Sequence, residues 1–222
     1  MIRRFVKWFF PGVVALLACV TASSTTPWVP RDRREELAAF EDIVEAEIVE
    51  EDGPTRSPPL ARAGTCSTTY AAAAVTRVLK GNRGIEETIL LGGLPKIQAN
   101  FPLTRGNRYV LFLQKDVSDD LDDERDQCPN SALLQRASAM KGSFAGVYTG
   151  YHDFAIGTAN GKATVAVWGY KGNTGWLFLE GYAFDERIPD SNRGGTLFIT
   201  SYEKFVSHVQ RMLAEAASAP DK

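Results

Sequence analysis

Residues 16–19, Leu-Leu-Ala-Cys, carry the clearest chemical signal in this sequence, because they place a thiol directly after an apolar run. The run spans residues 8–18 and follows three basic residues near the N-terminus. A basic start, an apolar centre and small residues before the cleavage point are typical of an export signal. The thiol of a cysteine at this point can be diacylated, so that Cys19 becomes the mature N-terminus. The sequence therefore predicts a signal peptide over residues 1–18 and a lipid anchor at Cys19 that holds the protein on a bilayer.

Two other interpretations of the N-terminal run compete with the lipid anchor. A transmembrane helix is disfavoured, because the run contains Pro11 and is much shorter than the roughly 20 apolar residues that cross a bilayer. Ordinary secretion stays open, since cleavage after Ala22 would also follow small residues and would discard Cys19. We expect an anchored protein of the bacterial cell envelope, with a secreted or periplasmic protein as the alternative. Val20, where an acidic residue would indicate retention in the inner membrane, favours the outer membrane.

Cys66 and Cys128 are the cysteines that remain if Cys19 is acylated or removed. An even pair in an oxidising compartment predicts one disulfide. This disulfide would close a loop of about 60 residues and stabilise the fold by roughly 4 kcal/mol on the chain-entropy model. The alternative is a reactive thiol. It has less support, because Cys66 lacks a CxxC partner or a nearby histidine, and acidic residues beside Cys128 would raise the pKa of its thiol.

His152 and His208 are the two histidines of the chain. Neither is accompanied by an HExxH, GxSxG or CxxC pattern, so the sequence predicts no catalytic residue, no metal ligand and no cofactor. His152 precedes Asp153 directly. With Glu180 these two residues form the candidate set of a hydrolase, which we keep as an alternative. His208 is expected on the solvated face of a C-terminal helix.

The charge pattern restricts the partners of the protein. Residues 116–126 are rich in aspartate and could be read as a calcium-binding loop, but they lack the central glycine and terminal glutamate of an EF-hand. A solvated acidic loop is therefore expected. Removing residues 1–18 takes the formal net charge from −2 to −5. With no basic cluster to neutralise phosphates, nucleic acid is excluded as a partner.

The aromatic side chains after residue 144 give the candidate binding surface. Residues 163–170 and 176–184 are expected to form strands on either side of a turn at residues 171–175. Alternate positions on these strands are aromatic, so the face is core if both sides of the sheet are covered. If one side is open, the face is a platform that could stack sugar rings or hold an extended peptide. Glu180 lies in the middle of this face, and its carboxylate would need a partner if it were buried. This residue keeps the platform interpretation open. The candidate face consists of Trp168, Tyr170, Trp176, Phe178, Glu180 and Tyr182.

The elements that must position these residues are mostly strands. Asn160-Gly161 is the strongest hairpin signal in the chain. Thr200 and Glu203 form a capping box before a helix with apolar residues at helical spacing. Residues 41–51 fit either a helix or a strand, and their β-branched content favours a strand. A helix is expected over residues 33–40, and further strands over residues 68–80, 87–91 and 108–114.

Three segments resemble exported bacterial domains similar to the netrin and tissue-inhibitor-of-metalloproteinases OB-fold. They are Ile-Val-Glu-Ala-Glu-Ile-Val at 43–49, Val-Thr-Arg-Val-Leu-Lys-Gly at 75–81, and Leu-Thr-Arg-Gly-Asn-Arg-Tyr-Val-Leu-Phe-Leu at 103–113. The resemblance implies an OB-like barrel. In the animal inhibitors, a cysteine at the mature N-terminus chelates the zinc of the target protease. Here Cys66 is internal and Cys19 would be acylated, so an inhibitor would act without that chelator.

Together these features predict one mainly β domain with some α-structure. We expect an OB-like β-barrel or sandwich, extended by hairpins and ended by an amphipathic helix. Residues 19–34 would form a disordered tether, residues 35–217 the domain and residues 218–222 a tail. The expected function is non-catalytic binding of an envelope protein or glycan by a membrane-anchored domain. The alternatives are a protease inhibitor without the zinc chelator and a hydrolase.

Overall fold

The computed structural model describes residues 32–52, 70–91, 103–114, 132–139, 146–148, 151–170, 174–190 and 194–218. Cys19, Cys66, Cys128 and residues 116–126 lie outside these ranges, so the predicted anchor, disulfide and acidic loop remain predictions. The elements in chain order are α1 (Arg33–Ala38), β1 (Asp42–Asp52), β2 (Tyr70–Lys80), β3 (Thr88–Leu91), β4 (Arg108–Leu113), α3 (Ala132–Ala139), β5 (Gly146–Tyr148), β6 (Tyr151–Ala159), β7 (Lys162–Tyr170), η2 (Leu177–Leu179), β8 (Glu186–Asp190), β9 (Gly195–Ser201) and α4 (Tyr202–Ala217).

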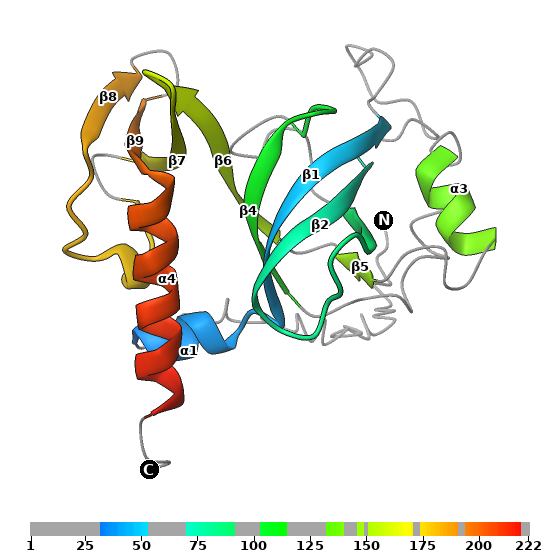
Figure 1. Cartoon of the computed structure of the whole chain (residues 1–222), viewed down its shortest axis with the longest axis horizontal. Coiled ribbons are helices and arrows are strands. Elements are labelled where there is room, and N and C mark those ends of the chain that lie inside the picture. Colours follow the sequence, from blue (N-terminus) through cyan, green and yellow to red (C-terminus); the bar gives the residue numbers. More distant parts are fainter. Residues whose placement is uncertain are drawn as a thin grey trace, which may run out of the picture.

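The strands form one twisted sheet with the order β5-β3-β2-β1-β4-β6-β7-β9-β8 (Figure 1). All ladders are antiparallel except the one between β3 and β5. No ladder of the described residues joins β5 to β8, so the sheet is open in this order. The prediction of a mainly β domain that ends in an amphipathic helix is confirmed. Pairing of β1 with both β2 and β4 is compatible with an OB-like order, and the OB-fold itself stays a prediction.

β1 shows why the pattern of residues 41–51 was ambiguous. Ile43 packs in a core on one side of the sheet, whereas Val44, Ala46 and Ile48 pack in a core on the other side. Because both sides of this central strand are covered, apolar residues need not alternate with polar ones. Three register shifts against β2 bend the strand. The strand interpretation is confirmed.

Two apolar cores lie on opposite sides of the sheet. The first is covered by α1, η2 and α4, and Figure 1 shows α4 lying along the end of the sheet that contains β7 and β9. The second lies on the other side of β1 to β4. The first core contains most of the buried aromatic rings: Phe40, Phe112, Phe154, Phe178, Phe198 and Phe205.

Residues 176–184 do not form the predicted strand. They contain the short 3-10 helix η2, flanked by Gly175 and Gly181 with φ of 76° and 73°. The reason is the carboxylate of Glu36 in α1, which accepts hydrogen bonds from the backbone amides of Leu177 (3.0 Å) and Phe178 (2.8 Å). These amides therefore bond to a side chain rather than to a neighbouring strand. The neighbour of β7 is β9 instead.

The N-terminus of α4 begins one residue later than the capping box predicted. Ser201 is the N-cap, and its hydroxyl accepts from the amide of Lys204 at 3.4 Å. Thr200 is fully buried at the end of β9, where its hydroxyl donates to the carboxylate of Asp185 at 3.1 Å. The predicted helix is confirmed, and its inward residues Phe205, Val206, Val209 and Met212 are buried. No helix of the described ranges is both long and apolar enough to cross a bilayer.

Candidate functional site

The candidate binding face of the sequence analysis is split between the two sides of the sheet. Side chains alternate along β7, where Val165 and Val167 are buried in the core under α4. Trp168 and Tyr170 therefore point to the opposite side. Trp176, Phe178 and Tyr182 belong to the core that α4 covers. The prediction of one continuous aromatic face is wrong, because the last three residues are on a turn packed under a helix.

For Trp176, Phe178 and Tyr182 the core interpretation is confirmed. Phe178 is fully buried, and its ring stacks on Phe112 with centroids 5.2 Å apart and planes inclined by 21°. Tyr182 is half-buried beneath α4, and its hydroxyl lies 3.0 Å from that of Thr200. Burial raises the pKa of the Tyr182 hydroxyl. These side chains stabilise the domain and are closed to a large ligand.

Trp168 and Tyr170 belong to a surface of three strands, which we call the β7–β9–β8 face. Residues that are directly opposite in a ladder point to the same side of a sheet. Trp168 is opposite Leu197, which is opposite Ile188 on the outer strand. Two parallel rows flank this one. They are Tyr170, Gly195 and Asp190 on one side, and Ala166, Ile199 and Glu186 on the other.

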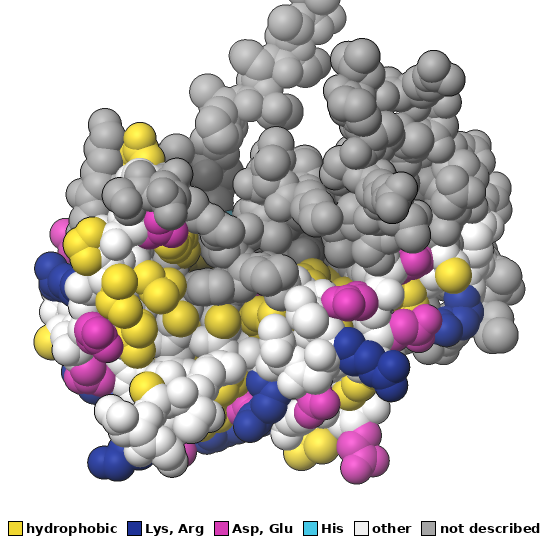
Figure 2. All heavy atoms as spheres, turned by 90° about the horizontal axis from the view of Figure 1, so that it is seen from above, with side chains coloured by type: hydrophobic (Ala, Val, Ile, Leu, Met, Phe, Trp, Pro, Cys, Tyr) yellow, Lys and Arg dark blue, Asp and Glu magenta, His cyan; other side chains and the backbone are white. Residues whose placement is uncertain are grey.

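The β7–β9–β8 face is apolar and reaches solvent. Tyr170 is 62% exposed and Ile188 is 40% exposed, while Trp168, Leu197 and Ile199 are half-buried. Figure 2 shows hydrophobic side chains at the surface of the end of the molecule formed by these strands, with acidic and basic side chains beside them. An exposed aromatic and aliphatic patch on a sheet is typical of an interaction surface.

Two glycines that sequence reasoning missed shape this face. A Cβ atom at Gly195 would lie 2.3 Å from Cζ2 of Trp168 and 2.8 Å from the carbonyl oxygen of Gly169. At Gly194 it would lie 3.9 Å from the ring of Tyr170. The indole therefore leans across the start of β9 and covers a position that only glycine can occupy. The Gly-Gly pair before an apolar strand was the available signal, since glycine in a strand often marks a close approach.

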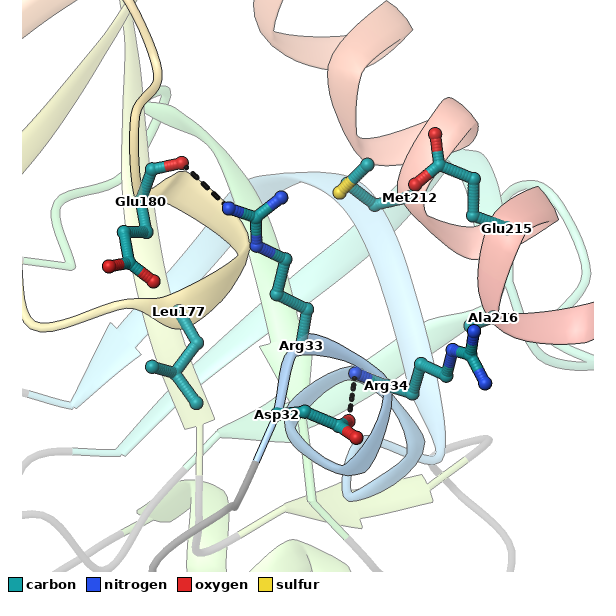
Figure 3. Close-up of a pocket in the computed structure, with 8 residues that line it drawn as sticks. All are labelled: Asp32, Arg33, Arg34, Leu177, Glu180, Met212, Glu215 and Ala216. Carbon is teal, nitrogen blue, oxygen red and sulfur yellow. Dashed lines mark hydrogen bonds between the residues drawn. The ribbon is translucent and has the colours of Figure 1, made fainter. Parts of the chain in front are cut away.

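Glu180 is exposed, which agrees with its polarity. It lies at the end of η2 and does not belong to the β7–β9–β8 face. Its backbone carbonyl accepts a hydrogen bond from Nη2 of Arg33 at 3.2 Å. It lines an open pocket of about 460 Å³ between α1, η2 and α4 (Figure 3). Arg33 and Arg34 line it together with the carboxylates of Asp32, Glu180 and Glu215, so the pocket has no dominant charge. The lining residues are Asp32, Arg33, Arg34, Leu177, Glu180, Met212, Glu215 and Ala216.

The candidate hydrolase residues are not brought together. The ring of His152 packs edge-on against Trp176 with centroids 4.6 Å apart, and against Phe40 at 5.8 Å. Burial lowers the pKa of this imidazole. Asp153 is buried on the other side of β6. Burial raises the pKa of Tyr109 there, and the charge of Asp153 adds a smaller increase. Glu180 directly follows η2 and is exposed. No cluster of three or more metal-ligating side chains occurs within the described part of the chain.

His208 is not on the solvated face of α4, as predicted, but half-buried against η2. Its Nε2 lies 2.6 Å from the carbonyl oxygen of Phe178, and its Nδ1 lies 3.0 Å from Nη2 of Arg211. The ring also packs on Tyr182 with centroids 4.7 Å apart. Burial lowers the pKa of His208, and the charge of Arg211 lowers it further. The neutral ring, with one donor and one acceptor nitrogen, fits both contacts.

Comparison of the chain with protein-family models, with curated proteins and with solved structures found no match.

Proposed function

We propose that this chain is a non-catalytic, lipid-anchored domain of the bacterial cell envelope that binds a protein or glycan through its β7–β9–β8 face. The observation that carries the proposal is the position of Trp168 and Tyr170. Both rings project from the side of the sheet opposite α4, and Tyr170 is 62% exposed. Aromatic rings at the centre of an exposed apolar surface contribute a large share of binding free energy at interfaces.

The geometry of the polar residues supports binding over hydrolysis. A general acid or base must lie within hydrogen-bond reach of the proton that it transfers, and a hydrolase built on these three residues would need them at one site. His152 is enclosed by aromatic rings, and the neighbouring Asp153 points to the other side of the sheet. Glu180 faces solvent beside α1. The three residues therefore serve different parts of the structure.

The outer strand of the face also argues for recognition by side chains. β8 is at the edge of the sheet, where an extended peptide could add as a further strand. Pro189 in β8 has no amide to donate, and charged residues on both sides of Ile188 disfavour strand addition. A ligand is thus expected to contact the broad face rather than the edge.

The predicted anchor would hold the domain close to the membrane. Asp32, where the described chain begins, follows Cys19 by 13 residues. A flexible link of that length has a root-mean-square extension of about 20 Å. An acylated Cys19 would therefore keep the domain within reach of envelope components at the membrane surface.

The test is capture of envelope fragments by the full chain in liposomes. Liposomes that carry the protein are mixed with labelled envelope fragments from cells that lack it, and the label that floats with the liposomes is measured. We expect a double variant, Trp168→Ala with Tyr170→Ala, to capture at least tenfold less than the wild type. Ile85→Ala is the matched control, because Ile85 is 67% exposed and lies on the β2–β3 turn. Equal capture by the double variant and the wild type would overturn the proposal.

A further inference from the structure

The pocket between α1, η2 and α4 is separate from the β7–β9–β8 face (Figure 3). Its volume of about 460 Å³ is in the range of pockets that bind small molecules. Leu177 of η2 and the α4 residues Met212 and Ala216 give it apolar surface. Figure 3 shows the side chain of Arg33 reaching between η2 and α4, and that of Arg34 extending from α1 toward the C-terminal end of α4. The pocket thus combines apolar surface with charged groups from separate elements.

Two acidic side chains of this pocket already have partners. The carboxylate of Asp32 caps α1, where it accepts hydrogen bonds from the amides of residues 34–35 at 2.8 and 3.0 Å. The carboxylate of Glu215 pairs with Nη1 of Arg211 at 2.8 Å. Nη2 of Arg211 in turn lies 3.0 Å from Nδ1 of His208. These groups are therefore engaged within the domain.

Arg34 and Glu180 differ from this pair. Among the described residues, none forms a hydrogen bond or ion pair with the guanidinium of Arg34 or the carboxylate of Glu180. Both residues are exposed, and both line the same pocket without pairing with each other. Arg33 donates to the backbone carbonyl of Glu180 at 3.2 Å and has further N–H groups to offer. The pocket therefore keeps two opposite charges apart.

The surroundings of the pocket do not favour a ligand of a single charge sign. Arg31 directly precedes α1 and its cap in the sequence, and Asp221 and Lys222 follow α4; these three residues lie outside the described ranges and also carry both signs. A simple anion would meet the carboxylate of Glu180, and a simple cation would meet the guanidinium of Arg34. A ligand that carries both charges can pair with both residues.

We propose that this pocket binds a small zwitterion with an anionic group at one end and a primary ammonium group at the other. Its phosphate or carboxylate would accept from the guanidinium groups of Arg33 and Arg34. Its ammonium would donate to the carboxylate of Glu180, and the carbon atoms between them would lie against Leu177 and Met212. A free amino acid has this chemistry, and so does the aminophosphate headgroup of a membrane lipid. The inference does not depend on the binding proposed for the β7–β9–β8 face.

Isothermal titration calorimetry of the full chain in detergent micelles tests the ligand class. The zwitterionic probes are glycine and O-phosphoethanolamine, and the matching anions without an ammonium group are acetate and inorganic phosphate. We expect at least one zwitterion to bind at least tenfold more tightly than its matching anion. Equal affinity of each zwitterion and its anion, or no binding of either zwitterion, would overturn the inference.

Three single variants locate the site. Arg34→Gln should weaken binding of the zwitterion at least tenfold, because a hydrogen bond between charged groups is lost. Glu180→Gln should bring the affinity of the zwitterion close to that of its anion, because the partner of the ammonium is removed. The matched control is Arg105→Gln, since Arg105 is exposed on the turn before β4 and should not affect binding. Equal affinities in all three variants would contradict the proposal, and near-ultraviolet circular dichroism verifies that each variant is folded.

Liposomes distinguish the two sources of the zwitterion. The full chain is placed in phosphatidylcholine liposomes with or without phosphatidylethanolamine, and hydrogen exchange of α1 and η2 is measured. Phosphatidylcholine is the control lipid, because its quaternary ammonium cannot donate a hydrogen bond to Glu180. Slower exchange with phosphatidylethanolamine that is lost in Arg34→Gln would identify a lipid headgroup, whereas unchanged exchange together with binding of glycine would identify a free zwitterion. Unchanged exchange without binding of either soluble zwitterion would overturn the inference.

Discussion

Replacing Glu36 by alanine is expected to destabilise the domain by about 2–4 kcal/mol. The Glu36 side chain is 5% exposed, and its two oxygens accept from the amides of Leu177 and Phe178. Removal of the carboxylate leaves both amides without these acceptors, and an unsatisfied buried donor costs about 1–3 kcal/mol. The Leu177 amide is only partly buried, so its share belongs at the low end. Burial raises the pKa of Glu36, which shows that desolvation of the charge offsets part of the gain.

The measurement is urea unfolding at neutral pH, followed by the near-ultraviolet signal of Trp176 in the adjacent core. A loss of about 3 kcal/mol would lower the melting temperature by roughly 6–12 °C for a domain of this size. Glu36→Gln keeps the shape but only one oxygen acceptor, so about half of the loss is expected. The control is Glu215→Ala. It removes an exposed carboxylate that pairs with Arg211 on α4 and should cost less than about 0.5 kcal/mol.

A Glu36→Ala variant as stable as the Glu215→Ala control would refute the reasoning. That result would mean that the two amides find other acceptors, and that residues 176–184 fold as a turn for reasons independent of α1. A large loss in Glu36→Ala with no loss in Glu36→Gln would instead indicate that side-chain volume matters and that the second hydrogen bond does not.

Three further predictions concern titration, the polar contacts of α4 and the cysteines. Burial lowers the pKa of His152 in the folded state below the value of about 6.5 that it has in the unfolded chain. The unfolded chain therefore binds a proton more readily, so the folded state loses stability as the pH falls below about 6.5. Urea midpoints measured between pH 7 and pH 5 should therefore fall less steeply in His152→Phe, and an unchanged slope would contradict this. Tyr202→Phe should lower the free energy of unfolding in urea by about 1–2 kcal/mol, because the Tyr202 hydroxyl donates to the buried carboxylate of Glu45 and accepts from Arg77. A decrease of less than about 0.3 kcal/mol would show that these hydrogen bonds are dispensable. Intact mass spectrometry of the full chain from its membrane should show an acylated Cys19 terminus and a gain of about 2 Da on reduction, whereas an unreduced mass identical to the reduced one would exclude the disulfide between Cys66 and Cys128.

Local sequence signals predicted the elements whose structure is decided locally. Asn160 and Gly161 have φ of 52° and 74°, the left-handed values that a tight hairpin turn requires and that asparagine and glycine tolerate best. The apolar spacing of the C-terminal segment predicted α4, because one side of the helix, with Phe205, Val209 and Met212, is buried in the core. β1 was predicted for a similar reason, since its buried residues Ile43, Val44 and Ile48 are β-branched.

The features that sequence reasoning got wrong depend on contacts between separate parts of the chain. The aromatic alternation of residues 176–184 matches a strand, but the hydrogen bonds that hold it as a turn come from Glu36, 141 residues away from Leu177. The same is true of Thr200, which looked like a helix cap but bonds to Asp185 across the loop before β8. His208 looked solvated on a helical wheel, and the carbonyl group of Phe178 is its partner.

The two sides of the sheet differ in how their aromatic side chains are packed, and Tyr170 is the exposed one. Under α1, η2 and α4 the aromatic rings are packed against each other, which is the arrangement that stabilises a domain most. On the other side of β7 and β9, the exposed Tyr170 ring gains little of the 1.5–3 kcal/mol that full burial of a large apolar side chain provides. Gly195 beneath Trp168 also lowers strand stability by roughly 0.5–1 kcal/mol relative to alanine. Folding stability alone does not account for the exposed ring of Tyr170, whereas the binding that we propose for the β7–β9–β8 face would account for it.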